Sequence, residues 1–349
     1  MNRRIFSKKL ALGLATVGTL ASCRLEAQEK PLINSEDLIK PKRLRAGAKV
    51  GLITPGSFIP DEALKKAIAN VKKLGYKVVL GKNIRALRGF TAGTDAQRLE
   101  DLHAMFADPE IDAIWCARGG YGCTRLLPMI DYDLIRSNPK VLIGYSDITA
   151  LHNAILQRSD LVTFHGPVTS STMTAYTTQQ FKAVLETPGR HQIKLSKANQ
   201  EKKDELYQAK TIRGGKARGA LIGGNLSLLA AMAGTAYELD FRDKLVFMED
   251  IEEKPYRVDR MLTQLRQSGR LGEAAGFAMG TFAGCEPEPD DRSLSLLETL
   301  EDRLLGLRKP CAYGLSWGHI SNQATLPVGI QAELDADQHT LTLLEAGVS

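Results

Sequence analysis

A single serine stands where a buried strand gives way to a helix. The segment "KVLIGY" (140–145) has the apolar content of a strand and "DITALHNAILQRS" (147–159) that of a helix, with Ser146 between them. At the carboxyl end of a strand in an open α/β sheet, such a hydroxyl is exposed and lies at a helix N-terminus, whose amides face developing negative charge. A serine on such a strand-to-helix turn is typical of a nucleophile elbow. The match is partial, because "GYSDI" has Ile148 where the G-x-S-x-G pattern has its second glycine. From this stretch alone, a helix N-cap is the more ordinary interpretation of Ser146.

A glycine-rich loop follows another apolar strand pattern. In "ARGGYGCTRLL" (117–127), Gly119, Gly120 and Gly122 come directly after "IDAIWC". Glycines let the backbone approach a ligand closely, and their free amides can form an oxyanion hole or cradle a phosphate. The nucleotide-binding patterns G-x-G-x-x-G and G-x-x-x-x-G-K-[ST] are both absent. The loop therefore favours an oxyanion hole over a nucleotide site.

A hydroxyl nucleophile also needs a base and a group that orients the base. Among the six histidines, His165 in "TFHGP" and His319 after "YGLSWG" follow apolar strand patterns and are candidates for the base. The strand pattern "LVFMED" ends in acids that include Glu249, and Glu252 follows shortly after. The acids after this strand are also what an ordinary charged loop shows, and each of these signals is weak when taken separately.

Strand and helix patterns alternate along the chain and must position these groups. Strand, helix and strand with short connections, as in residues 49–57, 61–75 and 76–81, predict βαβ units and a parallel sheet. We expect a doubly wound, mostly parallel N-terminal α/β domain over residues 46–172. A polar linker over 173–205 and a smaller, mixed α/β C-terminal domain over 206–349 are expected to follow, with the active site between the domains.

Several sequence blocks, in order, resemble the LD-carboxypeptidase family of serine peptidases. This family includes the muramoyl-tetrapeptide carboxypeptidases and the microcin-immunity peptidases. The blocks are residues 106–155, which include the glycine loop and "GYSD", and then "TFHGPV", "GGNLSLL", "FMEDIEEKPYRVDRMLTQL" and "GLSWGH". The resemblance extends from about residue 47 to about residue 332, which makes it far more specific than any one motif.

The resemblance implies a catalytic triad of Ser146, Glu249 and His319 that is shared between two domains. The acidic block departs slightly from the family pattern, because Met248 stands where leucine is usual. Glu252 is the alternative orienting acid, since the family block carries a second glutamate there. Glu249 is preferred because it ends a strand, where a rigid scaffold can hold it.

The same resemblance implies the remaining parts of the site. Backbone amides of Gly120 and Asp147 are expected to form the oxyanion hole, and His165 takes a structural or pocket role. The candidates for substrate contact are Arg118, Gly119, Tyr121 and Asn225, with Arg125 beside the loop as either a substrate contact or a surface ion pair.

The implied reaction is release of the terminal D-alanine from a murein tetrapeptide through an acyl-enzyme, without metal or cofactor. Cysteines at 116, 123, 285 and 311 have no C-x-x-C spacing and lie in no histidine cluster, which argues against zinc. An immunity-type peptidase acting on another acyl-peptide and a non-catalytic periplasmic peptide-binding lipoprotein are the alternatives. A complete Ser146, Glu249 and His319 set favours the enzyme over the binding protein. The resemblance also suggests a homodimer.

The first 22 residues have the pattern of an export signal. "MNRRIFSKK" is basic and "LALGLATVGTLA" is apolar but short for a membrane span. "LASC" (20–23) resembles a bacterial lipobox, so we expect lipidation at Cys23, a tether over 23–45 and a location on the periplasmic face of an envelope membrane. Cleavage near Ala27, which yields a soluble periplasmic protein, is the alternative, and the basic segment fits either a twin-arginine or a Sec signal.

The net charge does not indicate a nucleic-acid partner. The chain carries 46 basic and 40 acidic side chains, for a formal charge of +6. Four of the basic residues precede residue 23, and without them 42 basic side chains face 40 acidic ones. A nucleic-acid footprint requires a clustered basic face, and the sequence contains none.

Overall fold

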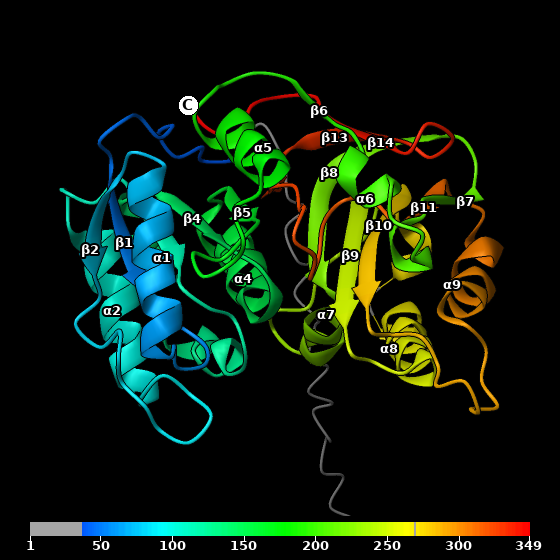
Figure 1. Ribbon diagram of the computed structural model, residues 1–349, viewed down its shortest axis with the longest axis horizontal. Helices are drawn as coiled ribbons and strands as arrows, with labels where there is room; N and C mark the ends of the chain where they lie inside the picture. Colours follow the sequence, from blue (N-terminus) through cyan, green and yellow to red (C-terminus); the bar gives the residue numbers. More distant parts are fainter. Residues whose placement is uncertain (1–36, 269) are drawn as a thin grey trace, which may run out of the picture. The chain divides into compact units, whose positions relative to one another are not determined.

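Two β-sheets and the helices packed on them build residues 37–268 and 270–349, the part of the chain that this computed structural model describes (Figure 1). These residues belong to one compact unit. The predicted signal segment, Cys23 and the first part of the predicted tether lie outside the described residues. Within the described part, no helix has both the length and the apolar content needed to cross a membrane.

The first sheet has six strands in the order β12-β5-β4-β3-β1-β2. Five of them are parallel, and β12 joins the edge antiparallel to β5. The strands are β1 (Lys49–Ile53), β2 (Lys77–Leu80), β3 (Ala113–Cys116), β4 (Val141–Gly144), β5 (Thr163–His165) and β12 (Leu326–Val328). Every residue of β3 and β4 is buried, as expected for parallel strands covered on both faces by helices.

The helices of this half follow the strands in the predicted alternation. They are α1 (Asp61–Lys73), α2 (Asp95–Ala107), α3 (Tyr132–Ser137) and α4 (Thr149–Ser159). Helix α2 begins with a capping box between Thr94 and Gln97, so the predicted start of that helix is marked by side chains that satisfy its first amides. Short 3₁₀ segments occupy the turns before α3 and α4, namely η2 (Cys123–Arg125), η3 (Leu127–Met129) and η4 (Ser146–Ile148).

The second sheet has eight strands in the order β6-β14-β13-β8-β9-β10-β11-β7, two more than the first. Strands β8 to β11 run parallel, and the strands at both edges are antiparallel. The strands are β6 (His191–Ile193), β7 (Lys210–Arg213), β8 (Lys216–Asn225), β9 (Leu245–Ile251), β10 (Gly276–Ala283), β11 (Cys311–Tyr313), β13 (Gln331–Asp335) and β14 (Thr340–Leu343). Its helices are α7 (Leu226–Met232), α8 (Pro255–Ser268) and α9 (Leu296–Leu304), with 3₁₀ segments η5 (Glu205–Tyr207), η6 (Leu271–Glu273) and η7 (Leu305–Leu307). The predicted fold class, a mostly parallel α/β half followed by a mixed α/β half, is confirmed.

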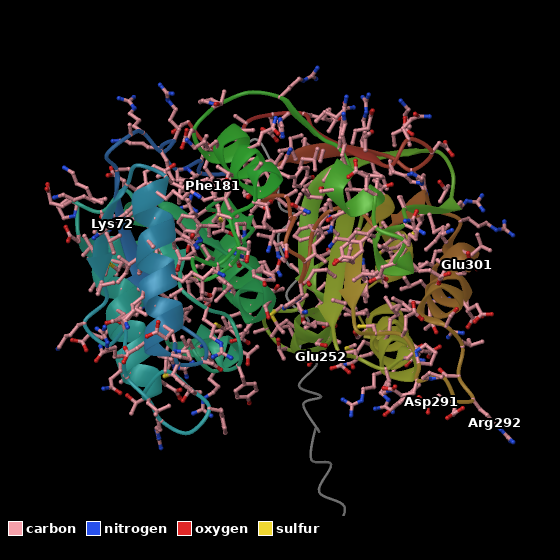
Figure 2. The ribbon with its side chains drawn as sticks, viewed as in Figure 1. Lys72, Phe181, Glu252, Asp291, Arg292 and Glu301 are labelled. Atoms are coloured by element: carbon pink, nitrogen blue, oxygen red, sulfur yellow. The ribbon has the colours of Figure 1, made fainter. Side chains whose placement is uncertain are left out.

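The range 173–205 differs from the polar linker that its composition suggested. It contains α5 (Ala175–Leu185), β6 and α6 (Lys197–Gln200). The Phe181 ring on α5 stacks on Trp115 of β3 with centroids 4.6 Å apart, and Phe181 is labelled in Figure 2. Because β6 also pairs with β14, this segment belongs to the packed body. Most residues of α5 are polar, but its few apolar side chains are enough to bury one face of the helix.

The end of the predicted tether is also part of the body. Ile39 forms a parallel bridge with Leu161, and the Leu44 amide donates to the Leu185 carbonyl oxygen at 2.8 Å. Leu44 itself is buried. The chain therefore packs against the body from about Ile39, before the boundary at residue 46 that the sequence predicts.

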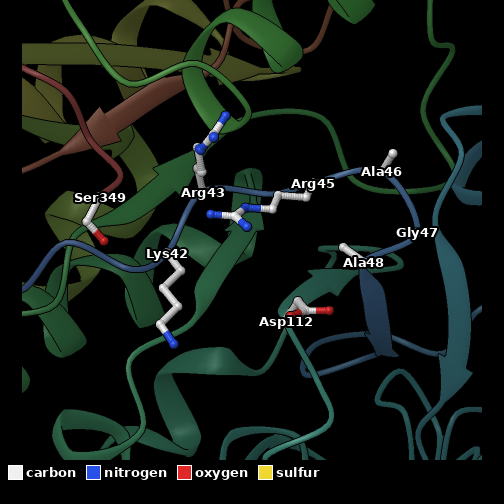
Figure 3. A pocket seen from close by; sticks show the side chains of 8 residues that line it. All are labelled: Lys42, Arg43, Arg45, Ala46, Gly47, Ala48, Asp112 and Ser349. Carbon is white, nitrogen blue, oxygen red and sulfur yellow. The ribbon is translucent and has the colours of Figure 1, made fainter.

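A basic hollow of about 590 Å³ lies beside this entering segment (Figure 3). It is lined by Lys42, Arg43, Arg45, Ala46, Gly47, Ala48, Asp112 and Ser349. None of the predicted catalytic residues lines this hollow, so it is not the predicted active site.

Candidate active site

Ser146 lies on a strained turn between β4 and α4. Its φ angle is +64°, in the left-handed region that residues other than glycine seldom adopt. Gly144 at the end of β4 makes the turn feasible, because a Cβ there would lie 2.9 Å from a side-chain carbon of Ile148. Ser146 caps neither helical segment, since the N-cap positions are Tyr145 for η4 and Ile148 for α4. The strain and the free hydroxyl match a nucleophile elbow better than a helix cap.

The glycine loop packs directly against this turn. A Cβ on Gly119 would lie 3.1 Å from the Ser146 Cβ and 3.4 Å from the Asp147 amide nitrogen. Gly120 has a φ of +97°, and within the described residues its amide donates no hydrogen bond. The Gly120 amide is therefore free to bind an oxygen close to Ser146.

Two buried charged side chains hold the glycine loop in place. The Asp147 Oδ2 accepts from the Cys123 amide at 2.9 Å and also accepts from the Gly122 amide. Burial raises the pKa of Asp147, although these hydrogen bonds oppose the rise. Arg98 donates from Nη1 to the Pro55 carbonyl oxygen at 2.6 Å and to that of Gly122 at 2.9 Å. These roles of Asp147 and Arg98 were not predicted from the sequence. The available signals were an aspartate directly after Ser146 and an arginine that faces inward from α2.

Glu249 and His319 form the second half of the site. Glu249 lies on β9 and is fully buried, and its Oε2 is 2.7 Å from Nδ1 of His319. The His319 side chain is 13% exposed. Because Nδ1 faces the carboxylate, Nε2 is the nitrogen left to exchange a proton. The rival acid Glu252 lies beyond the end of β9 with an exposed side chain and makes no hydrogen bond to His319 (Figure 2).

The electrostatics of this pair favour a charged histidine. Burial disfavours the charged form of each group, yet the opposite charge and the hydrogen bond outweigh it. The pKa of Glu249 therefore lies below its ordinary value and that of His319 above its own. Such a carboxylate holds one imidazole tautomer and stabilises the imidazolium.

Tertiary contacts bring the serine turn to this pair. The Tyr145 ring lies 4.7 Å, centroid to centroid, from the His319 imidazole, and Ser146 is the next residue along the chain. Thr149 Oγ1 accepts a hydrogen bond from the backbone amide of Asn225 at 2.9 Å. Asn225 in turn pairs with Glu249 in the register of β8 and β9. No hydrogen bond joins Ser146 to His319 among the described residues, and catalytic hydrogen bonds are commonly long in unliganded enzymes.

Family profiles match both halves of the chain. The profile of the LD-carboxypeptidase N-terminal domain matches residues 50–166, and that of the C-terminal domain matches residues 218–334. The chain belongs to the LD-carboxypeptidase family. The family and the enzyme class predicted from the sequence, a serine-type LD-carboxypeptidase, are confirmed.

Individual relatives cover almost the whole body. A probable murein peptide carboxypeptidase of Bacillus subtilis is 41% identical over 310 residues, which is 89% of this chain and 95% of that protein. The murein tetrapeptide carboxypeptidase of Pseudomonas aeruginosa is 33% identical, with 83% and 94% of the two chains covered. Among solved structures, an MccF-like protein of Bacillus anthracis has a TM-score of 0.78 at 30% identity and covers 88% of this chain and 99% of its own. The muramoyltetrapeptide carboxypeptidase of Oxalobacter formigenes has a TM-score of 0.73 at 30% identity, with 86% and 99% covered.

The carboxypeptidase uses Asn225 internally. The Asn225 side chain is 3% exposed, donates to Asp250 Oδ1 at 2.9 Å and accepts from the Leu228 amide as the N-cap of α7. Both ends of its amide are therefore occupied, in contrast to the substrate contact expected from the sequence. Through these contacts Asn225 joins the end of β8 to Asp250 on β9 and to the start of α7.

The other predicted substrate contacts divide into exposed and buried groups. Arg118 is exposed, with Nη1 3.1 Å from the Phe58 carbonyl oxygen, and the Tyr121 side chain is 53% exposed. Gly119 is buried against the serine turn. Arg125 makes two hydrogen bonds to Asp95, which is the surface ion pair considered as its alternative role.

His165 lies inside the carboxypeptidase, against Tyr145 and Phe247. Its ring is 6.1 Å from that of Tyr145 and 5.1 Å from that of Phe247, and the residue is 1% exposed. Burial lowers the pKa of His165 to about 4, which keeps the imidazole neutral. The sequence predicts a structural or pocket role for His165, and this enclosed position favours the structural one.

The remaining groups considered from the sequence are the cysteines and possible metal ligands. The cysteines of the described part are free, buried thiols, and burial raises the pKa of Cys116 and Cys123. Within residues 37–268 and 270–349, no group of three or more histidine, cysteine, aspartate or glutamate side chains gathers that could hold a metal ion.

Proposed function

We propose that this LD-carboxypeptidase hydrolyses the L,D-peptide bond that holds the terminal D-alanine of a murein tetrapeptide, with Ser146 as nucleophile. The observation that carries the proposal is the 2.7 Å hydrogen bond between buried Glu249 and His319, next to the strained turn of Ser146. The relatives named as murein peptide and murein tetrapeptide carboxypeptidases support this substrate.

In the proposed mechanism, His319 takes the proton of Ser146 as its hydroxyl oxygen attacks the scissile carbonyl. Glu249 keeps the Nδ1 proton in place and stabilises the imidazolium that forms at His319. The imidazolium then gives its proton to the leaving amine, and D-alanine departs from the acyl-enzyme. Water attacks the ester in the second half-reaction, with His319 again acting as base.

The negative charge on the carbonyl oxygen needs amide donors beside the serine. Gly120 supplies a free amide on the rigid glycine loop, and Asp147 supplies the amide that follows the nucleophile. The Asp147 carboxylate bonds the same loop, so one residue joins both sides of the proposed oxyanion hole. Preorganised donors of this kind contribute a large share of the rate enhancement in acyl transfer.

The test is release of D-alanine from purified murein tetrapeptide. Ser146→Ala is expected to lower kcat by about 10⁴-fold or more while the far-ultraviolet circular dichroism and Tm stay unchanged. Ser137→Ala, at an exposed position on α3, is the matched control and keeps full activity. Wild-type activity in Ser146→Ala would end the proposal.

A second candidate is cleavage of another acyl-peptide, as in the immunity branch of the family. The likeness to the MccF-like protein of Bacillus anthracis favours it. The same assay distinguishes the two, because the second candidate predicts that murein tetrapeptide stays intact while another acyl-peptide is cleaved.

We also propose that the enzyme works at the periplasmic face of the envelope as a lipoprotein anchored through Cys23. The apolar segment followed by "LASC" supports this location. Radioactive palmitate should label the wild-type protein in cells and should not label Cys23→Ala. An unlabelled wild type would refute the anchor and leave the soluble periplasmic form.

A further inference from the structure

A second serine, Ser57, contacts the glycine loop from the segment that follows β1. The residue is buried. Its amide donates to the Gly119 carbonyl oxygen at 3.0 Å, and its Oγ accepts from the Tyr121 amide at 3.1 Å. Ser57 therefore bonds the loop on both sides of Gly120, the residue proposed to supply an oxyanion-hole amide.

The first of these bonds fixes the peptide group that carries the Gly120 amide. The Gly119 carbonyl and the Gly120 N–H belong to one planar trans peptide group, so they point in opposite directions. When the Ser57 amide holds the carbonyl oxygen, the direction of the Gly120 N–H is fixed as well. A donor at the carbonyl oxygen also polarises the peptide group and makes its N–H a stronger donor.

The second bond decides which amide of the loop stays free. The hydroxyl oxygen occupies the Tyr121 amide, and the Asp147 carboxylate occupies the next two amides, those of Gly122 and Cys123. Among the described residues, the Gly120 amide is the one amide of positions 120–123 that has no acceptor. The network thus selects a single donor for an incoming oxygen.

Ser57 is itself held in place by its surroundings. The carbonyl oxygen of Pro55, two residues earlier, accepts from Nη1 of the buried Arg98 at 2.6 Å. Gly120 packs tightly on Ser57, because a Cβ on Gly120 would lie 2.4 Å from the Ser57 Oγ and 2.5 Å from its Cβ. A donor supported by locked neighbours in this way is preorganised for its partner.

We propose that Ser57 is a positioning residue for the reaction, which aims the Gly120 amide at the carbonyl oxygen of the substrate and withholds the Tyr121 amide from that oxygen. This inference rests on the proposed function, because it concerns the oxyanion hole of that reaction. Ser57 acts through the glycine loop and not by contact with the reacting atoms. Misplacing a catalytic group by about 1 Å costs on the order of 10²-fold in rate, so a loop that loses one of its two bonds to Ser57 should react more slowly.

The first test is D-alanine release from murein tetrapeptide by Ser57→Ala, which loses the Oγ acceptor and keeps the backbone bond to Gly119. Its kcat should fall about tenfold while KM changes by less than about twofold. Ser57→Thr retains the hydroxyl and should keep kcat within about threefold of the wild type. Ser159→Ala is the matched control, because it removes another buried serine hydroxyl, which donates to the Tyr132 carbonyl oxygen at 2.9 Å, and its kcat should equal that of the wild type.

A boronic-acid analogue of the peptide separates positioning from a general loss of structure. Its boron binds the Ser146 oxygen in a tetrahedral adduct that places an oxygen in the oxyanion hole, whereas the tripeptide product forms no adduct. Ser57→Ala should weaken inhibition by the analogue about tenfold and leave product binding as in the wild type. Equal weakening of both ligands, or unchanged kcat and unchanged inhibition by the analogue, overturns the inference.

Amide hydrogen exchange, measured by NMR, separates this inference from the proposed reaction. The Tyr121 amide should exchange about tenfold faster in Ser57→Ala than in the wild type, because it loses its acceptor. That result supports the hold of Ser57 on the loop even where the wild type releases no D-alanine. Equal exchange in the two proteins refutes it even where D-alanine is released.

Discussion

Replacing Glu249 by glutamine removes one charge from the centre of the site while it keeps the shape of the side chain. The amide can still reach His319, but its N–H₂ end can donate to Nδ1 and so favour the tautomer that has no acceptor at Nε2. A neutral partner also withdraws the attraction that stabilises the imidazolium. Both effects act on the step in which His319 takes the proton of Ser146.

The size of the loss follows from the geometry. With a hydrogen bond of 2.7 Å, the charge centres of carboxylate and imidazolium are roughly 4 Å apart, which is worth about 4 kcal/mol at an effective dielectric constant of about 20. Each ~1.4 kcal/mol corresponds to about a tenfold change in rate. We therefore expect Glu249→Gln to lower kcat by about 10³-fold with a small change in KM.

The pH profile supplies a second readout. In the proposed mechanism activity requires neutral His319, whose pKa is raised because the Glu249 charge and hydrogen bond outweigh burial. The wild-type kcat/KM should therefore rise with pH through a pKa above the ordinary histidine value of 6.5. In Glu249→Gln burial acts unopposed by that charge, so the same limb should move to lower pH.

The assay is D-alanine release from murein tetrapeptide between about pH 4 and 9, with Glu252→Gln as the matched control. Glu252 is a nearby exposed acid without a hydrogen bond to His319, and its loss should change kcat by less than about threefold. A fall of less than about tenfold in Glu249→Gln with an unmoved limb would refute the reasoning. So would an equal fall in Glu252→Gln.

Three further outcomes follow from the contacts around the site. Gly120→Ala should lower kcat by about 10²-fold, because a left-handed φ of +97° and a Cβ 2.4 Å from a serine oxygen displace the free amide, whereas Gly189→Ala, at a left-handed position in open space, should leave kcat intact. Thr149→Val should lower the free energy of unfolding in urea by about 1–3 kcal/mol, because the buried backbone amide of Asn225 loses its acceptor. An unchanged midpoint of urea unfolding would contradict that role of Thr149. The pKa of Glu249 is depressed, so its interaction with His319 stabilises the fold above the ordinary glutamate pKa of 4.5. The pKa of His319 is raised, so the same interaction stabilises the fold below the ordinary histidine pKa of 6.5. The Tm difference between wild type and Glu249→Gln should therefore be greatest between these two pH values and shrink on either side; a constant difference would argue against the pair.

Much of the candidate site was predictable because its signals are local in the chain. A strand, a sharp turn and a helix around Ser146, and a glycine loop after another strand, are patterns of a few residues each. The choice of Glu249 over Glu252 also followed from a local feature, the end of β9. Family blocks in order then gave the three residues of the proposed triad.

Other features depended on partners that are distant in sequence. Helix α5 is rich in polar residues, and the packing of Phe181 on Trp115 together with the pairing of β6 and β14 explains why residues 173–205 are folded. Asn225 belongs to a family block, yet its side chain is occupied by Asp250 and by the start of α7. No pattern near these residues indicates which neighbour they meet.

The sequence by itself determined the α/β alternation, which is read from residue types and short spacings, and the family, whose blocks occur in order along the chain. The roles proposed for Ser146, His319 and Glu249 came from that family resemblance. Only the tertiary structure decided that the turn at Ser146 is strained and that Asp147 and Ser57 hold the glycine loop. The physical reason is that hydrogen bonds and packing join groups by distance in space. His319 and Glu249 are 70 residues apart in the chain, and their atoms meet at 2.7 Å because the segment after β11 folds back onto β9 and β10 of the second sheet.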